Sequence, residues 1–143
     1  SILLATDDWF QKLFFPDITS TPTMTWATER INRCEDLIWN VAMQIVHSST
    51  SVVLDIGLAT RDARLTYLER CQSKDLQYSF HYVTAPIELR KKRVAERNKQ
   101  VNTKGGYVVS DGMFQYTDGL FEVPDAEELT ALNAVIVRNE GEV

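Results

Sequence analysis

Acidic side chains stand where the apolar segments of this chain end. Asp7 and Asp8 directly follow an apolar run at residues 2–5, and Asp55 closes a second run, SVVLD. In parallel sheets, ligands bind beyond the carboxyl ends of the strands. Three carboxylates on one rim repel each other unless a cation or a proton donor lies between them. The pattern therefore predicts a site for Mg²⁺ and a hydroxyl substrate, although any single Asp is also typical of a helix cap or a strand end.

Basic side chains gather on one later segment. RKKRVAERNK, residues 90–99, holds six of the fifteen Lys and Arg residues and a single acid. Arg90, Arg93 and Arg97 are spaced i, i+3 and i+7, so they share one stripe of a helix. Such a stripe is often only a solvated face, but guanidinium groups also bind phosphate oxygens in a bidentate manner. The Gly105-Gly106 pair downstream favours the second interpretation, because it would let the helix close as a lid over a phosphoryl donor.

The elements that position these residues follow from the hydrophobic pattern. Strands are expected at 2–5, 51–55, 76–83 and 133–137. A short helix is expected to start at Trp9, and further helices at about 25–48, 60–71, 84–98, 110–121 and 125–132. The longest helix shows apolar residues at steps of three and four, and a loop is expected over residues 101–110. Leu65, Leu68 and Cys71 are expected to share the apolar face of their helix. The alternation of strand and helix predicts an α/β fold, a parallel sheet with helices on both faces.

Size and charge narrow the class of protein. The chain has 143 residues, which suits one domain, and a net charge of −5. An acidic balance argues against a general binder of nucleic acids or membrane surfaces. Cys34 and Cys71 fall on helix-like segments and are expected to be reduced, which predicts a cytoplasmic protein. His47 and His81 lack partners at zinc-ligand spacing.

Four segments in succession resemble a known family. LLATDDWF, VVLDIG, YVTAPIELRKKRVAERN and DGMFQYTDGLFEVP are similar to segments of small P-loop kinases of the zeta-toxin and chloramphenicol-phosphotransferase type. The resemblance is closer to the bacterial ATP-binding proteins grouped with them, and it covers almost the whole chain. It implies a single domain over residues 1–143 with a P-loop nucleoside-triphosphate-hydrolase-like, nucleotide-kinase-like fold.

The resemblance also implies roles for individual residues. Asp8 matches the base that takes the proton of the substrate hydroxyl, and Asp55 matches a residue that holds substrate or metal. Arg97 matches a lid arginine that contacts the phosphates of ATP. A second basic residue of the lid is expected at Arg93 or Lys104.

Further residues are assigned to the acceptor substrate. Asp7, Trp9 and Arg61 are predicted to bind it. If the chain stays extended past the first strand, Asp7 and Asp8 point to opposite sides, so only one of them faces the hydroxyl. Trp9 and the phenylalanines at positions 10, 14 and 15 could line the acceptor pocket, with core packing expected for at least two of these four.

One part of the family pattern is missing. The family begins with a strand, the phosphate loop G-x-x-x-x-G-K-[ST] and its helix, whereas this sequence contains no Gly-Lys pair and matches from the second strand onward. We therefore expect that this segment stood before Ser1. The missing strand lies in the middle of the family's sheet, so a chain without it would expose two unpaired strand edges.

These observations lead to one main prediction and two alternatives. The main prediction is an ATP- and Mg²⁺-dependent kinase that phosphorylates the hydroxyl of a small molecule. A nucleotide-binding or interaction module without catalysis is the alternative if the phosphate loop is absent from the native protein. A polynucleotide-end kinase is disfavoured by the acidic charge, and no nucleic-acid or membrane partner is expected. The acceptor (sugar nucleotide, antibiotic, nucleoside or amino alcohol) and homodimer formation stay open.

Overall fold

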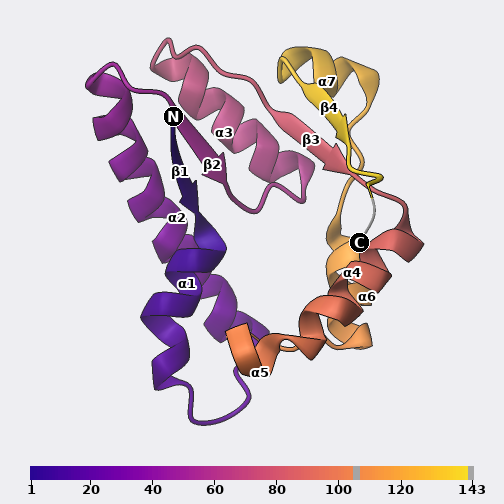
Figure 1. The fold of residues 1–143 in the computed structure, drawn as a ribbon. Helices are drawn as coiled ribbons and strands as arrows, with labels where there is room; N and C mark the ends of the chain where they lie inside the picture. Colours follow the sequence, from indigo (N-terminus) through magenta and orange to yellow (C-terminus); the bar gives the residue numbers. More distant parts are fainter. Residues whose placement is uncertain (105–106, 142–143) are drawn as a thin grey trace. The chain divides into compact units, whose positions relative to one another are not determined.

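The structure is a computed structural model that describes residues 1–104 and 107–141. The chain divides into two compact units, unit 1 (Ser1–Gly57) and unit 2 (Leu58–Val143). Each unit contains its own pair of parallel strands and its own helices. Figure 1 follows the chain from strand β1 near the N-terminus to strand β4 near the C-terminus.

Unit 1 consists of two short strands with helices between them. Its elements are β1 (Ile2–Ala5), α1 (Thr6–Phe14), the 3-10 helix η1 (Phe15–Asp17), α2 (Met24–His47) and β2 (Val52–Asp55). The predicted long helix is confirmed as α2. It starts after Thr23, whose hydroxyl accepts a hydrogen bond from the Trp26 N–H at 3.1 Å, as N-cap threonines do.

The start of α1 differs from the prediction. We expected a short helix from Trp9, but α1 begins at Thr6, directly after β1. The residue at the N-cap is Ala5, which provides no side-chain cap, so the sequence carries no capping signal there. Asp7 and Asp8 in the first turn favour the helix start instead, because carboxylates stabilise the positive end of the helix dipole.

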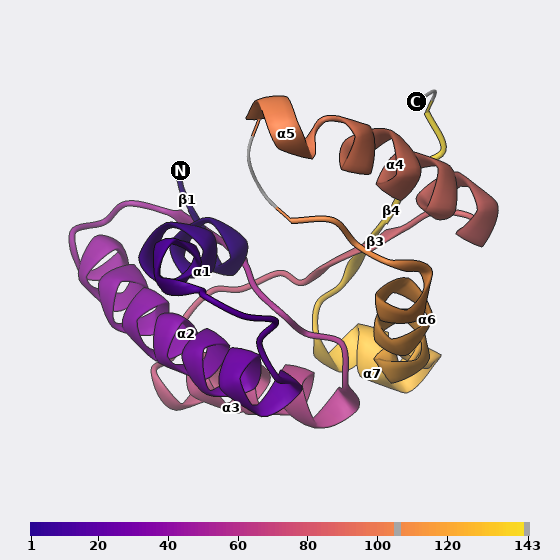
Figure 2. The same ribbon diagram turned by 90° about the horizontal axis from the view of Figure 1, so that it is seen from below.

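The core of unit 1 lies against α2. Its fully or nearly buried side chains include Leu4, Phe10, Cys34, Ile38, Ala42 and Met43. Full burial of a side chain the size of Ile38 contributes about 1.5–3 kcal/mol. Helix α1 packs alongside α2 (Figure 2), where the ring of Phe10 lies 6.0 Å from that of Trp26.

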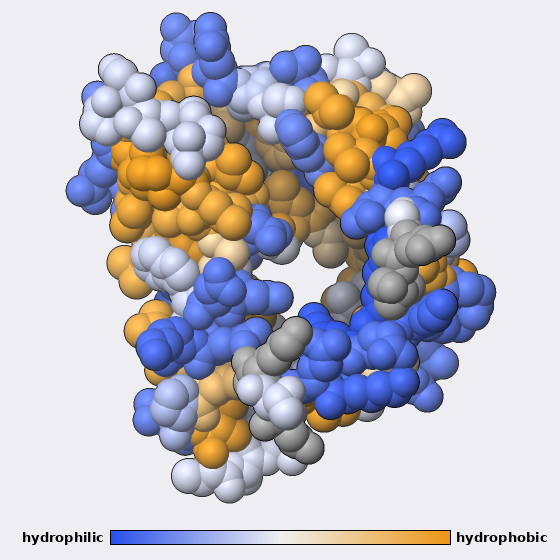
Figure 3. All heavy atoms as spheres, viewed as in Figure 1, coloured by the Kyte–Doolittle hydropathy of each residue, from blue (hydrophilic) through white to orange (hydrophobic). Residues whose placement is uncertain are grey.

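The strand pair of unit 1 is covered on one face only. β1 and β2 run parallel, with Leu4 opposite Leu54 and Ala5 opposite Asp55. Neighbouring residues of a strand point to opposite faces. Leu4 is buried on the face that packs against α2, while Leu3 and Val53 on the other face keep 62% and 51% of their surface exposed. The apolar surface over β1 and β2 is visible in Figure 3.

Unit 2 contains the remaining strands and helices. Its elements are α3 (Arg61–Ser73), β3 (His81–Thr84), α4 (Ile87–Lys99), α5 (Val101–Lys104), α6 (Asp111–Leu120), α7 (Ala126–Ala131) and β4 (Val135–Arg138). Three of these helices begin with a side-chain cap. The hydroxyl of Thr60 accepts from the Ala63 N–H, that of Ser110 from the Met113 N–H, and the carboxylate of Asp125 from the Glu128 N–H. The expected caps Thr60 and Ser110 are thereby confirmed.

The strands of unit 2 also leave one face bare. β3 and β4 are parallel, with His81 opposite Val135 and Val83 opposite Val137. Val83 is 58% exposed, and the two valines of β4 that share its face are exposed as well. On the other face, the ring of Tyr82 stacks on that of Phe121 with centroids 5.7 Å apart. Each unit thus presents apolar strand surface that its own described residues do not cover.

The predicted α/β class with parallel strands is confirmed, but the described strands form two pairs, β1–β2 and β3–β4, rather than one sheet with helices seen on both faces. Three local corrections apply as well. Strand and helix alternate, and all paired strands are parallel. The strand predicted at 76–83 is shorter, because only His81–Thr84 finds a pairing partner in β4. Residues 101–104 form the short helix α5 rather than a loop. Leu65 is exposed, and Arg64 and Tyr67 are buried beside Leu68 in its place.

Candidate functional site

The carboxyl ends of β1 and β2 bring the predicted acidic residues to one end of the unit 1 sheet. Ala5 lies opposite Asp55, and Asp7 and Asp8 follow two and three residues later in the first turn of α1. Because the chain is helical there, their side chains leave the axis about 100° apart. The expectation that they point to opposite sides, which assumed an extended chain, is therefore wrong. Both residues are exposed.

Asp8 and Asp55 follow the ends of neighbouring strands and have open carboxylates. Both are exposed, and neither forms a hydrogen bond or an ion pair with the described residues. Across the same residues, no three His, Cys, Asp or Glu side chains are close enough together to hold a metal ion. The predicted three-carboxylate metal site is thus not preformed, and the two aspartates remain available as individual oxygen ligands or proton acceptors.

The aromatic residues after Asp8 divide between core and surface. Phe10 is buried, and its ring lies within 5.4–6.0 Å of the rings of Phe14, Phe15 and Trp26. It therefore belongs to the core, as expected for part of this group. Trp9 is half-buried on the turn that carries Asp8.

The basic stripe of α4 is only partly available to a ligand. Arg90 forms an ion pair with Asp118 at 2.6 Å and also donates to the Ala85 carbonyl. Arg93 donates to the carbonyl and side-chain oxygens of Asn139 and to the Gly141 carbonyl at 2.8–3.3 Å. These two arginines tie α4 to α6 and to the segment after β4.

Arg97 differs from its two neighbours on the stripe. It is exposed, its guanidinium lies 5.9 Å from the centre of the Tyr107 ring, and it donates no hydrogen bond to the described residues. The side chain of Lys104 and the Gly105-Gly106 pair lie outside the described residues. Of the predicted nucleotide-binding residues, Arg97 is therefore the one that the structure describes with its donors open.

Arg61 is the first residue of α3. Its backbone N–H donates to Glu122 Oε2 at 2.6 Å, and its exposed guanidinium forms an ion pair with Asp125 at 3.4 Å. The sequence prediction missed the neighbouring Arg64, which is buried. The available signal was its position: Arg64, Leu68 and Cys71 are spaced i, i+4 and i+7, so an arginine falls on the face predicted to be apolar.

Comparison with known proteins provides one match. A family profile described as an AAA domain matches residues 1–110. The chain belongs to this AAA domain family. The family is of the P-loop NTPase type, so the match places the chain in a nucleotide-binding class that includes kinases, and it agrees with the α/β fold of parallel strands. No curated protein and no solved structure matches the chain.

The matched region contains both candidate sets of residues. It extends from β1 through α5 and so includes Asp8, Asp55 and Arg97. The segment at 121–128 lies beyond it. No described helix of this family member is long and apolar enough to cross a membrane.

Proposed function

We propose that this chain forms part of an ATP-dependent phosphotransferase that acts on the hydroxyl of a small molecule. The observation that carries the proposal is a pair of exposed carboxylates, Asp8 and Asp55, at the carboxyl ends of adjacent parallel strands in a member of a nucleotide-binding family. Neither has a partner among the described residues. This is where open parallel sheets bind their ligands. An unpaired carboxylate there is free to accept a proton or to bind a cation.

The two carboxylates receive different roles. Asp8 orients the acceptor hydroxyl and accepts its proton as the oxygen attacks the terminal phosphorus of ATP and the bond to the bridging oxygen of ADP breaks. Asp55 is the residue that would hold Mg²⁺, whose usual ligands in phosphotransferases are one or two carboxylates plus phosphate oxygens and water. The oxygen chemistry of Asp55 fits this ion, which supplies charge neutralisation on the phosphates when bound. Asp7 and Trp9, on the same turn as Asp8, contact the acceptor.

Basic residues of unit 2 are proposed to bind the phosphates of ATP and the acceptor. Arg97 binds the phosphates of ATP, supported by its open donors on an exposed helix face. Arg93 and Lys104 are the candidates for a second contact, and Arg93 would have to exchange its bonds to Asn139 and Gly141 for one to phosphate. Arg61 binds the acceptor.

A phosphate loop completes the domain in this proposal. A strand, phosphate loop and helix of the kind seen in the resembling kinases would supply the backbone N–H groups and the lysine that cradle the phosphates. Parallel strands are normally covered on both faces. The bare apolar surface at Leu3 and Val53 in unit 1, and at Val83 in unit 2, supports the presence of such a covering segment.

The test is phosphate transfer by the protein of the native open reading frame. The purified protein would be incubated with Mg²⁺ and ATP labelled in its terminal phosphate, together with panels of sugar nucleotides, antibiotics, nucleosides and amino alcohols. Transfer of label to a panel member, abolished in Asp8→Asn, is the expected result. ATP binding by calorimetry without transfer to any member would contradict catalysis.

One observation favours a second function, nucleotide binding without catalysis. Two of the three arginines on the α4 stripe are already paired within unit 2, which leaves less charge for a transferring phosphate than a kinase lid provides. Under this alternative the native protein binds ATP, and Asp8→Asn leaves every measured property of the nucleotide complex unchanged.

A further inference from the structure

Arg64 is unusual because it is a charged residue in the interior of unit 2. Only 5% of its surface is exposed, and in the described part of the chain no other charged residue is buried to this extent. Removing a charge from water costs several kcal/mol unless a partner and hydrogen bonds compensate for it. A buried arginine therefore calls for a complete set of acceptors.

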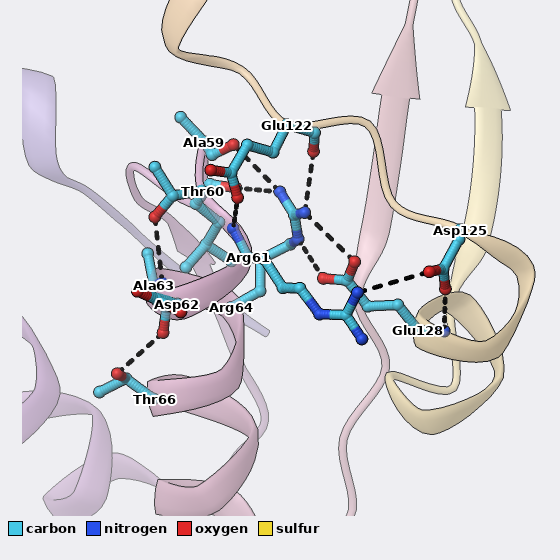
Figure 4. Close-up of polar contacts among 11 residues, drawn as sticks. Ala59, Thr60, Arg61, Asp62, Ala63, Arg64, Thr66, Glu122, Asp125 and Glu128 are labelled. Atoms are coloured by element: carbon cyan, nitrogen blue, oxygen red, sulfur yellow. Dashed lines mark hydrogen bonds and ion pairs between the residues drawn. The ribbon is translucent and has the colours of Figure 1, made fainter.

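The structure provides that set. Each of the five N–H groups of Arg64 has an acceptor (Figure 4). Nε and Nη2 form a two-point contact with the carboxylate of Glu128, at 2.6 and 3.3 Å. Nη1 donates to the carbonyls of Leu58 and Ala59, and Nη2 also donates to the carbonyl of Glu122 at 2.8 Å. We call Arg64 with Glu128 the clamp.

The clamp joins the start of α3 to a segment about sixty positions further along the chain. That segment, residues 122–125, is in turn bonded to Ala59, just before α3, and to Arg61, its first residue. The Glu122 N–H donates to the Ala59 carbonyl at 2.8 Å, and the Glu122 carboxylate accepts from the Arg61 N–H. The Asp125 carboxylate meets the Arg61 guanidinium. Segment 122–125 thus contacts both the backbone and the side chain of Arg61, and Arg64 of the clamp in turn binds the Glu122 carbonyl of this segment.

The guanidinium of Arg61 has the fork that suits an anion. Its single described partner, Asp125, is bound through Nη1 at 3.4 Å. Its Nε and Nη2 donate to no described residue. The same two nitrogens of Arg64 bind the Glu128 carboxylate, which shows locally what this fork can accept. With 58% of its side-chain surface exposed, Arg61 offers this fork to the solvent.

We infer that Arg64 and Glu128 are positioning residues, which hold segment 122–125 against the start of α3 so that Arg61 presents its Nε–Nη2 fork to an oxyanion of the acceptor. The oxyanion is a phosphate or a carboxylate, since both match the guanidinium fork. This inference rests on the proposed function for the identity of the ligand as the acceptor. The position of Arg61 and its binding of an oxyanion do not depend on catalysis.

A variant that keeps stability but removes the clamp separates a positioning role of Arg64 and Glu128 from a purely stabilising one. Replacing a buried ion pair by apolar residues of similar size is often neutral or stabilising. The double variant Arg64→Met/Glu128→Leu is therefore expected to keep the thermal midpoint of the wild type while losing the bonds to the carbonyls of Leu58, Ala59 and Glu122. The control is Arg90→Met/Asp118→Leu, which removes another 2.6 Å ion pair of unit 2 that involves neither Arg61 nor residues 122–125.

The first measurement is site-resolved and needs no turnover. In the native full-length protein, phenylglyoxal modification of Arg61 is followed by mass spectrometry with inorganic phosphate, with acetate or with neither, and exposed Arg33 of unit 1 serves as the internal reference. We expect phosphate or acetate to slow modification of Arg61 but not of Arg33. We also expect this protection to disappear in the clamp double variant and to persist in the control variant. Protection by one anion alone identifies the class of oxyanion.

The second measurement is amide hydrogen exchange at Arg61 and Glu122. Exchange should speed up in the clamp variant and stay unchanged in the control variant. Unchanged exchange at both amides, or Arg61 protected by neither anion, would overturn the inference.

The third measurement applies once an acceptor is known. The clamp variant should raise the KM for the acceptor by about 10- to 100-fold, the value of a charge-assisted hydrogen bond, with the KM for ATP unchanged. An unchanged acceptor KM would also overturn the inference. If the wild type transfers no phosphate but the first two measurements behave as expected, the proposed function fails and the inference about Arg61 stands.

Discussion

Charged side chains at the end of the unit 1 sheet and at the start of α3 in unit 2 differ in their exposure and in their partners. At the sheet end, Asp8 and Asp55 are exposed and have no described partner. At the start of α3, Arg64 is buried and all of its donors are satisfied. An unpaired exposed carboxylate contributes little to folding and is available for a ligand. A fully paired buried arginine has no capacity left for a ligand and instead sets the position of the chain around it.

The largest effect is expected at the unpaired carboxylate. Asp8→Asn keeps the shape of the side chain but cannot accept a proton, so turnover should fall by about 10²–10⁴-fold while ATP affinity is retained. Asp7→Asn should reduce turnover much less. Steady-state phosphotransfer assays on both variants of the full-length protein test this. A silent Asp8→Asn beside an inactive Asp7→Asn would assign the base to the other carboxylate.

Removing Arg64 from its ion pair with Glu128 is expected to destabilise the protein. Arg64→Met alone leaves the Glu128 carboxylate in a buried position without its cation, and breaking one partner of a buried pair costs about 3–5 kcal/mol. Urea or thermal unfolding of the single variant should show this loss, and the added Glu128→Leu change should restore the stability of the wild type. If the single variant unfolds like the wild type, the clamp does not hold the chain as its geometry indicates.

The α4 stripe extends the comparison within one helix. Arg97 has open donors, whereas Lys99 is paired with Glu96 at 2.8 Å. If Arg97 stabilises charge that develops during transfer, Arg97→Ala should lower kcat by about 10-fold or more, and Lys99→Ala should leave it unchanged. Kinetics of the two variants that cannot be distinguished would show that α4 is a solvated basic face.

Substitution of Asp55 is expected to change the free energy of unfolding very little. It is an exposed residue with no described partner, and substitutions at such positions usually change the unfolding free energy by less than about 0.5 kcal/mol. Asp55→Asn should therefore unfold like the wild type yet weaken the dependence of turnover on Mg²⁺. A marked loss of stability would mean that Asp55 has a structural role.

The smallest effect concerns an exposed pair. The Lys99 ammonium, by its hydrogen bond and charge, holds the pKa of the Glu96 carboxyl below its usual value. A carboxyl with a lowered pKa favours the folded state above its unfolded pKa, and this contribution is lost as pH falls through the folded pKa. Lys99→Ala should return the Glu96 pKa towards its usual value, as measured by NMR titration. The pair is exposed, so we expect no measurable change in unfolding free energy.

Local patterns predicted much of the fold. The three- and four-residue spacing located α2, and Thr60 and Ser110 marked the starts of α3 and α6, because a capping hydroxyl satisfies the first free N–H groups of a helix. The start of α1 was missed because Ala5 provides no cap. The length of β3 was overestimated, since the aromatic residues before His81 fit a strand locally but find no partner strand.

The sequence also predicted one part of the candidate site and missed another. The order of the residues along the chain sufficed to locate Asp8 and Asp55 at the carboxyl ends of parallel strands, because strand alternation and right-handed crossovers leave few alternatives. It could not show that Arg90 and Arg93 are already paired, because their partners, Asp118 and Asn139, lie 28 and 46 positions away.

By itself, the sequence determined the α/β class, the parallel strands and the position of the acidic residues, because these follow from hydrophobic periodicity and short-range capping. The tertiary structure alone decided which charged side chains are paired within the fold and which remain available to a ligand. Arg64 and Arg97 are both helix arginines, and although Arg64 falls on the predicted apolar face of its helix, that position does not reveal a partner for its charge. Arg64 is buried, and Glu128, 64 positions later, completes its set of acceptors. Arg97 is exposed and has no hydrogen-bond acceptor among the described residues.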